Sequence, residues 1–205
     1  YRIASRGPHL GQPPIADSYP FYVLIESAGA DLEAEAGHFL DALTRATDLG
    51  LVQDAVLAQS ERERAAFWAI RDNIESLAVL WPLAIFDISL PLASMEDYLE
   101  RTGARLQQRL GTLRWITFGH LGDSNLHLAV ALDSDDPAAR HAVEEIVYGG
   151  LAGIGGSVSA EHGIGLEKRE FLHCSRSDAE IELMKTLKRA LDPRNILNPE
   201  RIFRL

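Results

Sequence analysis

The chain contains very little cysteine or lysine. Cys174 is its only cysteine among 205 residues, and its lysines are Lys168, Lys185 and Lys188. One thiol excludes a disulfide within the chain and a metal cluster held by several thiolates of that chain. We therefore expect a protein of a reducing compartment.

Basic charge is also scarce, because 20 Lys and Arg residues face 30 Asp and Glu residues, a formal net charge of −10. Nucleic acids and anionic lipids bind basic surfaces, so we expect neither as a partner. No apolar run is long enough to cross a bilayer, and no segment resembles a signal peptide. We expect a cytoplasmic protein with an ordinary globular composition, 46% hydrophobic and 24% charged.

A dinucleotide-binding fingerprint is missing as well. No Gly-x-Gly-x-x-Gly follows a predicted strand, and the cluster from Gly153 to Gly156 does not have that spacing. The chain opens at Tyr1 without an initiator methionine and keeps a loop composition through Pro14. We expect residues 1–20 to be an N-terminal loop cut from a longer chain, and residues 21–205 to form one domain.

Periodic apolar patterns predict strands and helices in alternation. Capping residues at Asp31, Ser60, Ser94, Asp136 and Ser177 open the predicted helices. These helices extend to about Gly50, Leu77, Leu110, Ala152 and Leu191, and the predicted strands cover 21–25, 51–58, 83–90, 113–119 and 125–132. Short strands with brief connections favour an α+β fold, a mostly antiparallel sheet covered by helices on one side.

The segment from Phe118 to Leu128 contains two histidines, His120 and His127. A hairpin between them would place both imidazoles at one end of the sheet, with Gly119 and Gly122 allowing a tight turn. Asp123 could orient one imidazole by accepting its N–H.

A second glycine-rich loop, residues 155–165, contains Glu161 and His162. Two imidazoles and one carboxylate leave coordination positions open on a divalent cation, which is typical of catalytic metal sites. If the side chains of Glu161 and His162 diverge, His162 can act as a base near neutral pH.

Three interpretations remain open at this point. The ligand set His120, His127 and Glu161 also suits a metal-dependent hydrolase that uses a water molecule. A binding module without catalysis would keep the same fold. Isolated histidines at strand ends are most often hydrogen-bonded surface residues.

Three motifs in this order resemble those of the C-terminal domain of FAD-linked oxidases, the D-2-hydroxyacid dehydrogenases of D-lactate, glycolate and D-2-hydroxyglutarate type. They are Gly119-His-Leu-Gly-Asp-Ser-Asn-Leu-His127, Gly155-Gly-Ser-Val-Ser-Ala-Glu-His-Gly-Ile-Gly165 with Lys168, and Leu191-Asp-Pro-Arg-Asn-Ile-Leu-Asn-Pro199. The likeness extends over nearly the whole chain and includes Phe86-Asp-Ile-Ser-Leu-Pro91.

The resemblance implies a ferredoxin-like C-terminal domain over residues 21–205 and a two-domain flavoenzyme. FAD would be held by an N-terminal domain that we expect this chain to lack, so the chain alone should have little redox activity. The implied roles are zinc or manganese ligands for His120, His127 and Glu161, the base for His162, a grip on the substrate carboxylate for Arg71, and a place near the flavin for Asn198.

The implied reaction converts a D-2-hydroxy acid into a 2-keto acid. His162 takes the hydroxyl proton, and FAD takes the hydride. The implied partners are a small 2-hydroxy acid and the FAD-binding domain, in the same or a separate chain. A homodimer is compatible with the sequence, and electron delivery to a quinone would place the parent enzyme at a membrane.

Three positions depart from the family pattern. Ser124 replaces a glycine, which is harmless only if its φ is negative. Ile85 and Ala129 replace a lysine and an asparagine that could hold a second carboxylate. We therefore expect a smaller or more apolar substrate than 2-hydroxyglutarate, and the same losses also favour the non-catalytic alternative.

Overall fold

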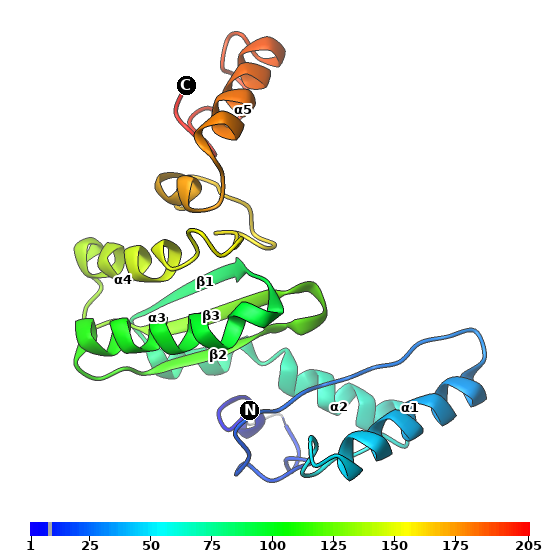
Figure 1. Ribbon diagram of the computed structural model, residues 1–205. Coiled ribbons are helices and arrows are strands. Elements are labelled where there is room, and N and C mark those ends of the chain that lie inside the picture. Colours follow the sequence, from blue (N-terminus) through cyan, green and yellow to red (C-terminus); the bar gives the residue numbers. More distant parts are fainter. Residues whose placement is uncertain (8–9) are drawn as a thin grey trace. The chain divides into compact units, whose positions relative to one another are not determined.

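The computed structural model describes residues 1–7 and 10–205, which divide into two units, Tyr1–Val79 and Leu80–Leu205 (Figure 1). The second unit contains the sheet and the histidine-bearing loops. The predicted boundary after residue 20 stays a prediction.

The first unit is helical. After the 3₁₀ helix η1 (Ala4–Arg6) come α1 (Leu32–Asp48) and α2 (Glu61–Arg71), and the 3₁₀ helix η2 (Ile74–Leu80) runs to the start of the second unit. The predicted caps are present, since the side chains of Asp31 and Ser60 accept hydrogen bonds from the amides of Ala34 and Glu63. The prediction of one helix through Leu77 was wrong, because α2 ends at Arg71 and a 3₁₀ helix follows.

The strands predicted at 21–25 and 51–58 were also wrong, because both segments are irregular. Their composition suits a strand, but a strand needs a hydrogen-bonded neighbour to be stable. Within the described residues the ladders join only the three strands of the second unit. Phe21 and Val23 accordingly remain 85% and 65% exposed.

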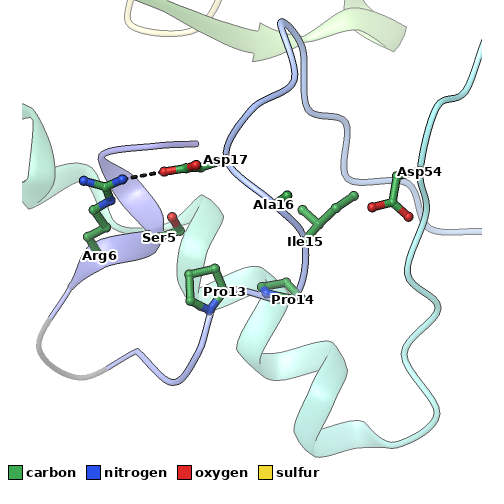
Figure 2. Close-up of a pocket in the computed structure, with 8 residues that line it drawn as sticks. All are labelled: Ser5, Arg6, Pro13, Pro14, Ile15, Ala16, Asp17 and Asp54. Carbon is green, nitrogen blue, oxygen red and sulfur yellow. Dashed lines mark hydrogen bonds and ion pairs between the residues drawn. The ribbon is translucent and has the colours of Figure 1, made fainter.

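The first unit has a cavity of about 450 Å³ in its N-terminal segment (Figure 2). Arg6 and Asp17 form an ion pair at its wall. The other lining residues are Ser5, Pro13, Pro14, Ile15, Ala16 and Asp54. No imidazole is among these described lining residues, so we place no catalytic site there.

The second unit is built on an antiparallel sheet in the order β1-β3-β2. Its strands are β1 (Leu83–Ser89), β2 (Trp115–His120) and β3 (Asn125–Ala131), close to the predicted ranges. Its helices are η3 (Leu92–Ser94), α3 (Met95–Leu110), η4 (Leu121–Asp123), α4 (Pro137–Gly149), η5 (Arg169–Cys174) and α5 (Asp178–Leu191).

The core of this unit lies between one face of the sheet and the helices α3 and α4, which lie on the same side of it (Figure 1). Side chains alternate between the two faces of a strand, so Phe86, Ile88, Leu128 and Val130 share this face. They pack with Tyr98, Leu106, Val143 and Val147 of the two helices. The predicted α+β fold is confirmed. The opposite face of the sheet carries Asp87 and His127 beside apolar residues such as Ile85 and Phe118.

Candidate active site

Strand register defines the face of the sheet opposite the core, which we call the polar face after its carboxylate, amide and imidazole side chains. Asp87 of β1 and Phe118 of β2 both lie opposite His127 of β3, and His120 lies opposite Asn125. All five residues therefore point away from the core that α3 and α4 cover. The hairpin brings the rings of His120 and His127 to a centroid distance of 6.2 Å.

Gly119 lets the two strands of this hairpin approach closely. A Cβ atom at this position would lie 2.3 Å from the carbonyl oxygen of Asn125, well inside van der Waals contact. Gly122, by contrast, has open space around it, so the tight turn depends on Gly119 rather than on both glycines. Only a glycine at position 119 permits this pairing.

Ser124 occupies the left-handed region, with φ 58° and ψ 21°. The condition for a harmless replacement of glycine, a negative φ, is therefore not met. A side chain in this region costs about 1 kcal/mol through contact of Cβ with the backbone.

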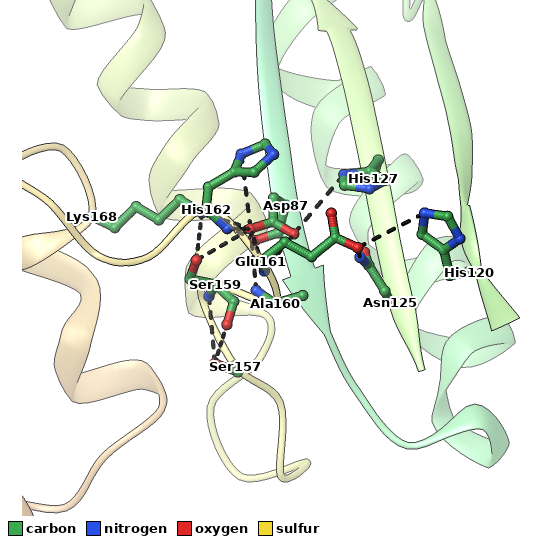
Figure 3. A network of polar contacts seen from close by, with 10 residues as sticks. All are labelled: Asp87, His120, Asn125, His127, Ser157, Ser159, Ala160, Glu161, His162 and Lys168. Atoms are coloured by element: carbon green, nitrogen blue, oxygen red, sulfur yellow. Dashed lines mark hydrogen bonds and ion pairs between the residues drawn. The ribbon is translucent and has the colours of Figure 1, made fainter. Parts of the chain in front are cut away.

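The second loop is attached to the end of β1. Ser89 and Ser157 exchange two backbone hydrogen bonds, of 3.1 and 2.7 Å. This bridge brings Glu161 to the polar face, where its Oε1 lies 3.8 Å from Nε2 of His120 and accepts a 2.7 Å hydrogen bond from Asn125 (Figure 3). The other amide atom of Asn125, its buried Oδ1, has no hydrogen-bond partner among the described residues.

His120, His127 and Glu161 offer ligand atoms that all lie within 4.8 Å of one another. Two imidazoles and a carboxylate suit zinc and leave coordination positions for a water molecule or a substrate. The donor set therefore fits a divalent cation with a small inward movement of the side chains.

A second group of donors, Asp87, Glu161 and His162, meets the same distance limit. The carboxylate of Asp87 already accepts hydrogen bonds from the amides of Glu161 and His162. Because its lone pairs are engaged, this second group is the weaker candidate for a cation.

The side chain of His162 is 58% exposed, and its Nδ1 lies 3.9 Å from Oδ2 of Asp87, whereas Glu161 faces His120 (Figure 3). The ring of His162 also stacks with that of His127, with the two centroids 6.0 Å apart.

His162 lines a cavity of about 330 Å³ together with Ile85, Arg140 and Arg201. An accessible imidazole at the wall of a cavity is suitably placed to exchange a proton with a small molecule. The role of His162 as a base stays a prediction.

Burial lowers the pKa of His127, although the charges of Asp87 and Glu161 act in the opposite direction. The neutral imidazole is thus favoured, and this is the form that binds metals.

Sequence reasoning missed Asp87 and chose Asp123 as the orienting carboxylate. Asp123 is exposed in η4, whereas Asp87 is buried and lies 4.0 Å from Nδ1 of His127. The sequence did contain a signal for Asp87, since it is the single carboxylate inside the apolar predicted strand 83–90. A charge that is buried in this way needs several partners.

No helix among the described residues is long and apolar enough to span a membrane.

The chain matches the family "FAD linked oxidases, C-terminal domain" over residues 8–202. It belongs to that family. This FAD-linked oxidase C-terminal domain is 37% identical to a D-2-hydroxyglutarate dehydrogenase of Xanthomonas citri pv. viticola and 39% identical to a mitochondrial one of Bos taurus. Each alignment covers 95% of this chain, but only 42% and 36% of the respective relative.

A further relative bears another substrate in its name. The domain is 34% identical to a Schizosaccharomyces pombe protein provisionally named a D-lactate dehydrogenase, over 92% of this chain and 38% of that protein. The resemblance identified from the motifs is confirmed, and the chain spans about two fifths of the curated relatives it matches.

The other two predicted site residues of this FAD-linked oxidase C-terminal domain are Arg71 and Asn198. Arg71 belongs to the first unit, where it ends α2, pairs with Asp72 at 2.9 Å and lies over the ring of Trp68. Asn198 is an exposed residue of the C-terminal tail with φ 47°. Their roles toward substrate and flavin stay predictions.

Proposed function

We propose that this chain is the substrate- and metal-binding part of a flavin-dependent dehydrogenase that oxidises a D-2-hydroxy acid to a 2-keto acid. The observation that carries the proposal is the meeting of His120, His127 and Glu161 within 4.8 Å, in a chain of the FAD-linked oxidase family. FAD would be held mainly by another domain.

The roles follow from the chemistry of alcohol oxidation, which removes a proton from oxygen and a hydride from carbon. When bound, a cation such as zinc or manganese supplies Lewis acidity and FAD supplies a two-electron acceptor. His120, His127 and Glu161 would hold the cation. His162 would accept the hydroxyl proton, because its side chain is accessible and lines the cavity.

The substrate would enter the cavity that His162 lines. A volume of about 330 Å³ lies at the lower end of the range for small-molecule sites. Ile85 and Ala129 are register partners on the polar face, beside Asp87 and His127. Because both are apolar, we propose a 2-hydroxy acid with a small or apolar side chain, although several relatives are named for 2-hydroxyglutarate.

The test is made on the intact flavoprotein that contains this chain, with lactate, a branched 2-hydroxy acid and 2-hydroxyglutarate as alternative substrates. His162→Ala should lower the rate of flavin reduction by a factor of about 100 to 10,000, because general base catalysis contributes that much. Metal content should stay unchanged. Full activity of this variant would refute the role of His162, and faster turnover of 2-hydroxyglutarate than of lactate would refute the proposed side chain.

Experiments on the same intact flavoprotein distinguish the proposed dehydrogenase from its two rival functions. Hydrolysis by a flavin-free preparation with zinc or manganese would favour the metal-dependent hydrolase. Failure to bind either metal would favour the non-catalytic module. A cytoplasmic location, a place at a membrane and a homodimer stay predictions, and some relatives are named mitochondrial.

A further inference from the structure

The carboxylate of Asp87 organises the loop that carries Glu161 and His162. The side chain is 0% exposed. Its oxygens accept hydrogen bonds from three consecutive backbone amides, those of Ala160 at 3.2 Å, Glu161 at 3.0 Å and His162 at 2.8 Å (Figure 3). Consecutive amides that converge on one anion form a nest, a concave anion-binding arrangement of the backbone. The loop has no helix or strand at these residues, so the anion at its centre holds its shape.

Lys168 supplies the countercharge. Its Nζ lies 3.4 Å from Oδ2 of Asp87 and donates to the Asp87 carbonyl oxygen at 3.2 Å and to Oγ of Ser159 at 3.1 Å. Its side chain is only 9% exposed. A buried charge is tolerated when it is paired and hydrogen-bonded, and both members of this pair meet that condition.

Asp87 also lies between the two functional imidazoles. Its Oδ1 is 4.0 Å from Nδ1 of His127, its register partner on β3, and its Oδ2 is 3.9 Å from Nδ1 of His162 (Figure 3). A carboxylate that faces Nδ1 favours the ring orientation in which Nε2 is the nitrogen that can bind a cation or accept a proton. One side chain thus accepts hydrogen bonds from the backbone of the ligand loop and lies within 4.0 Å of a nitrogen of each imidazole.

We propose that Asp87, neutralised by Lys168, is the positioning residue of this site. It sets Glu161 against His120 and His127, and it holds His162 with Nε2 directed away from the carboxylate. The inference rests on the proposed function, since it assumes that these residues hold a cation and a base. In this proposal Asp87 acts through the other residues and not as a ligand or a base.

The first test compares Asp87→Asn with Asp123→Asn in the intact protein, using zinc ions as the probe. The asparagine keeps the shape of Asp87 but turns an N–H₂ donor toward the amide donors of the loop. Zinc affinity should fall about 10- to 100-fold, the usual effect of losing an orienting partner. Asp123 is exposed, so its variant should bind zinc like the wild type. Unchanged zinc affinity in Asp87→Asn would overturn the proposal.

Amide hydrogen exchange provides an arm that needs no metal. The amides of residues 160–162 should be protected in the wild type and exchange faster in Asp87→Asn, while the amides of β3 keep their protection. This result separates the two proposals, because it is expected even if the wild type binds no zinc and the proposed function fails. Unchanged exchange at 160–162 would overturn the positioning role alone.

A double variant distinguishes positioning from a merely structural role. Lys168→Met alone leaves Asp87 buried and unpaired, and it should destabilise the fold strongly. The double variant Asp87→Asn/Lys168→Met removes both charges and should recover much of the thermal stability, but zinc affinity should remain low. Recovery of zinc affinity together with stability would show that Asp87 only supports the fold, and would overturn the proposal.

Discussion

At the scale of single residues, the site combines groups with opposing requirements. His127 is buried and has a lowered pKa, which favours the neutral form that binds a cation. His162 is exposed beside a cavity, where a base can meet a substrate. Two adjacent residues of one loop can therefore serve different functions, because Glu161 faces His120 and His162 lines the cavity.

Ser124 is the one residue of the hairpin loop whose backbone conformation disfavours its own side chain. Ser124→Gly should raise the free energy of unfolding by about 1 kcal/mol, because glycine adopts a positive φ without the Cβ contact. Chemical denaturation measures the change. Ser124→Ala is the matched control, since alanine keeps Cβ and should give no gain. Equal stabilisation by both variants would assign the effect to the hydroxyl group instead.

At the scale of elements, the hairpin β2–β3 and the loop after α4 bring the site together. The hairpin was predictable, because glycine and turn residues separate two apolar runs, and the site face followed from strand alternation. The irregular structure of residues 21–25 and 51–58 was not predictable, because a strand forms only beside a hydrogen-bonded partner strand, which composition cannot reveal. Asp87 was missed for a similar reason: its donors lie 72 to 81 residues away along the chain.

Gly119 gives a direct test of how the hairpin shapes the site. Gly119→Ala places a methyl group against the Asn125 carbonyl and should force β2 from β3 next to His120. We expect a loss of about 1–3 kcal/mol in stability, the usual cost of overpacking, together with weaker zinc binding. Thermal melts and calorimetric titration check both. Gly122→Ala, which meets open space, should change neither. Equal effects of the two substitutions would contradict the close approach at Gly119.

At the scale of the whole molecule, the two units differ in how much core they hold. The second unit buries a continuous apolar cluster. Among the described residues of the first unit, only Leu77 is a buried apolar side chain. Stability of the described fold therefore comes mainly from the unit that carries the site, and events in the site should be felt in global unfolding.

Lowering the pH of the metal-free protein should show how the protonation of Asp87 affects the free energy of unfolding. Burial alone would raise the pKa of Asp87, but the amides of His162 and Glu161 and the charge of Lys168 outweigh it and lower the pKa from 3.8 to about 2. A carboxyl group with a lowered pKa in the folded state stabilises the fold at any pH above its pKa in the unfolded state. That stabilisation is lost as the pH falls toward the pKa of the folded state. The contribution is about 2 kcal/mol.

The stability difference between the wild type and Asp87→Asn should therefore narrow as the pH falls from about 5 to about 2, because only the wild type carries this titrating group. Urea denaturation at a series of pH values measures it. A difference that stays constant over that range would contradict the lowered pKa.

We expect one divalent cation to bind between the hairpin and the second loop. Anomalous diffraction at the zinc absorption edge, from crystals of the intact protein grown with zinc, locates such an ion. We predict one strong peak within bonding distance of His120, His127 and Glu161. A peak among Asp87, Glu161 and His162 instead, or no peak on the polar face of the sheet, would contradict it.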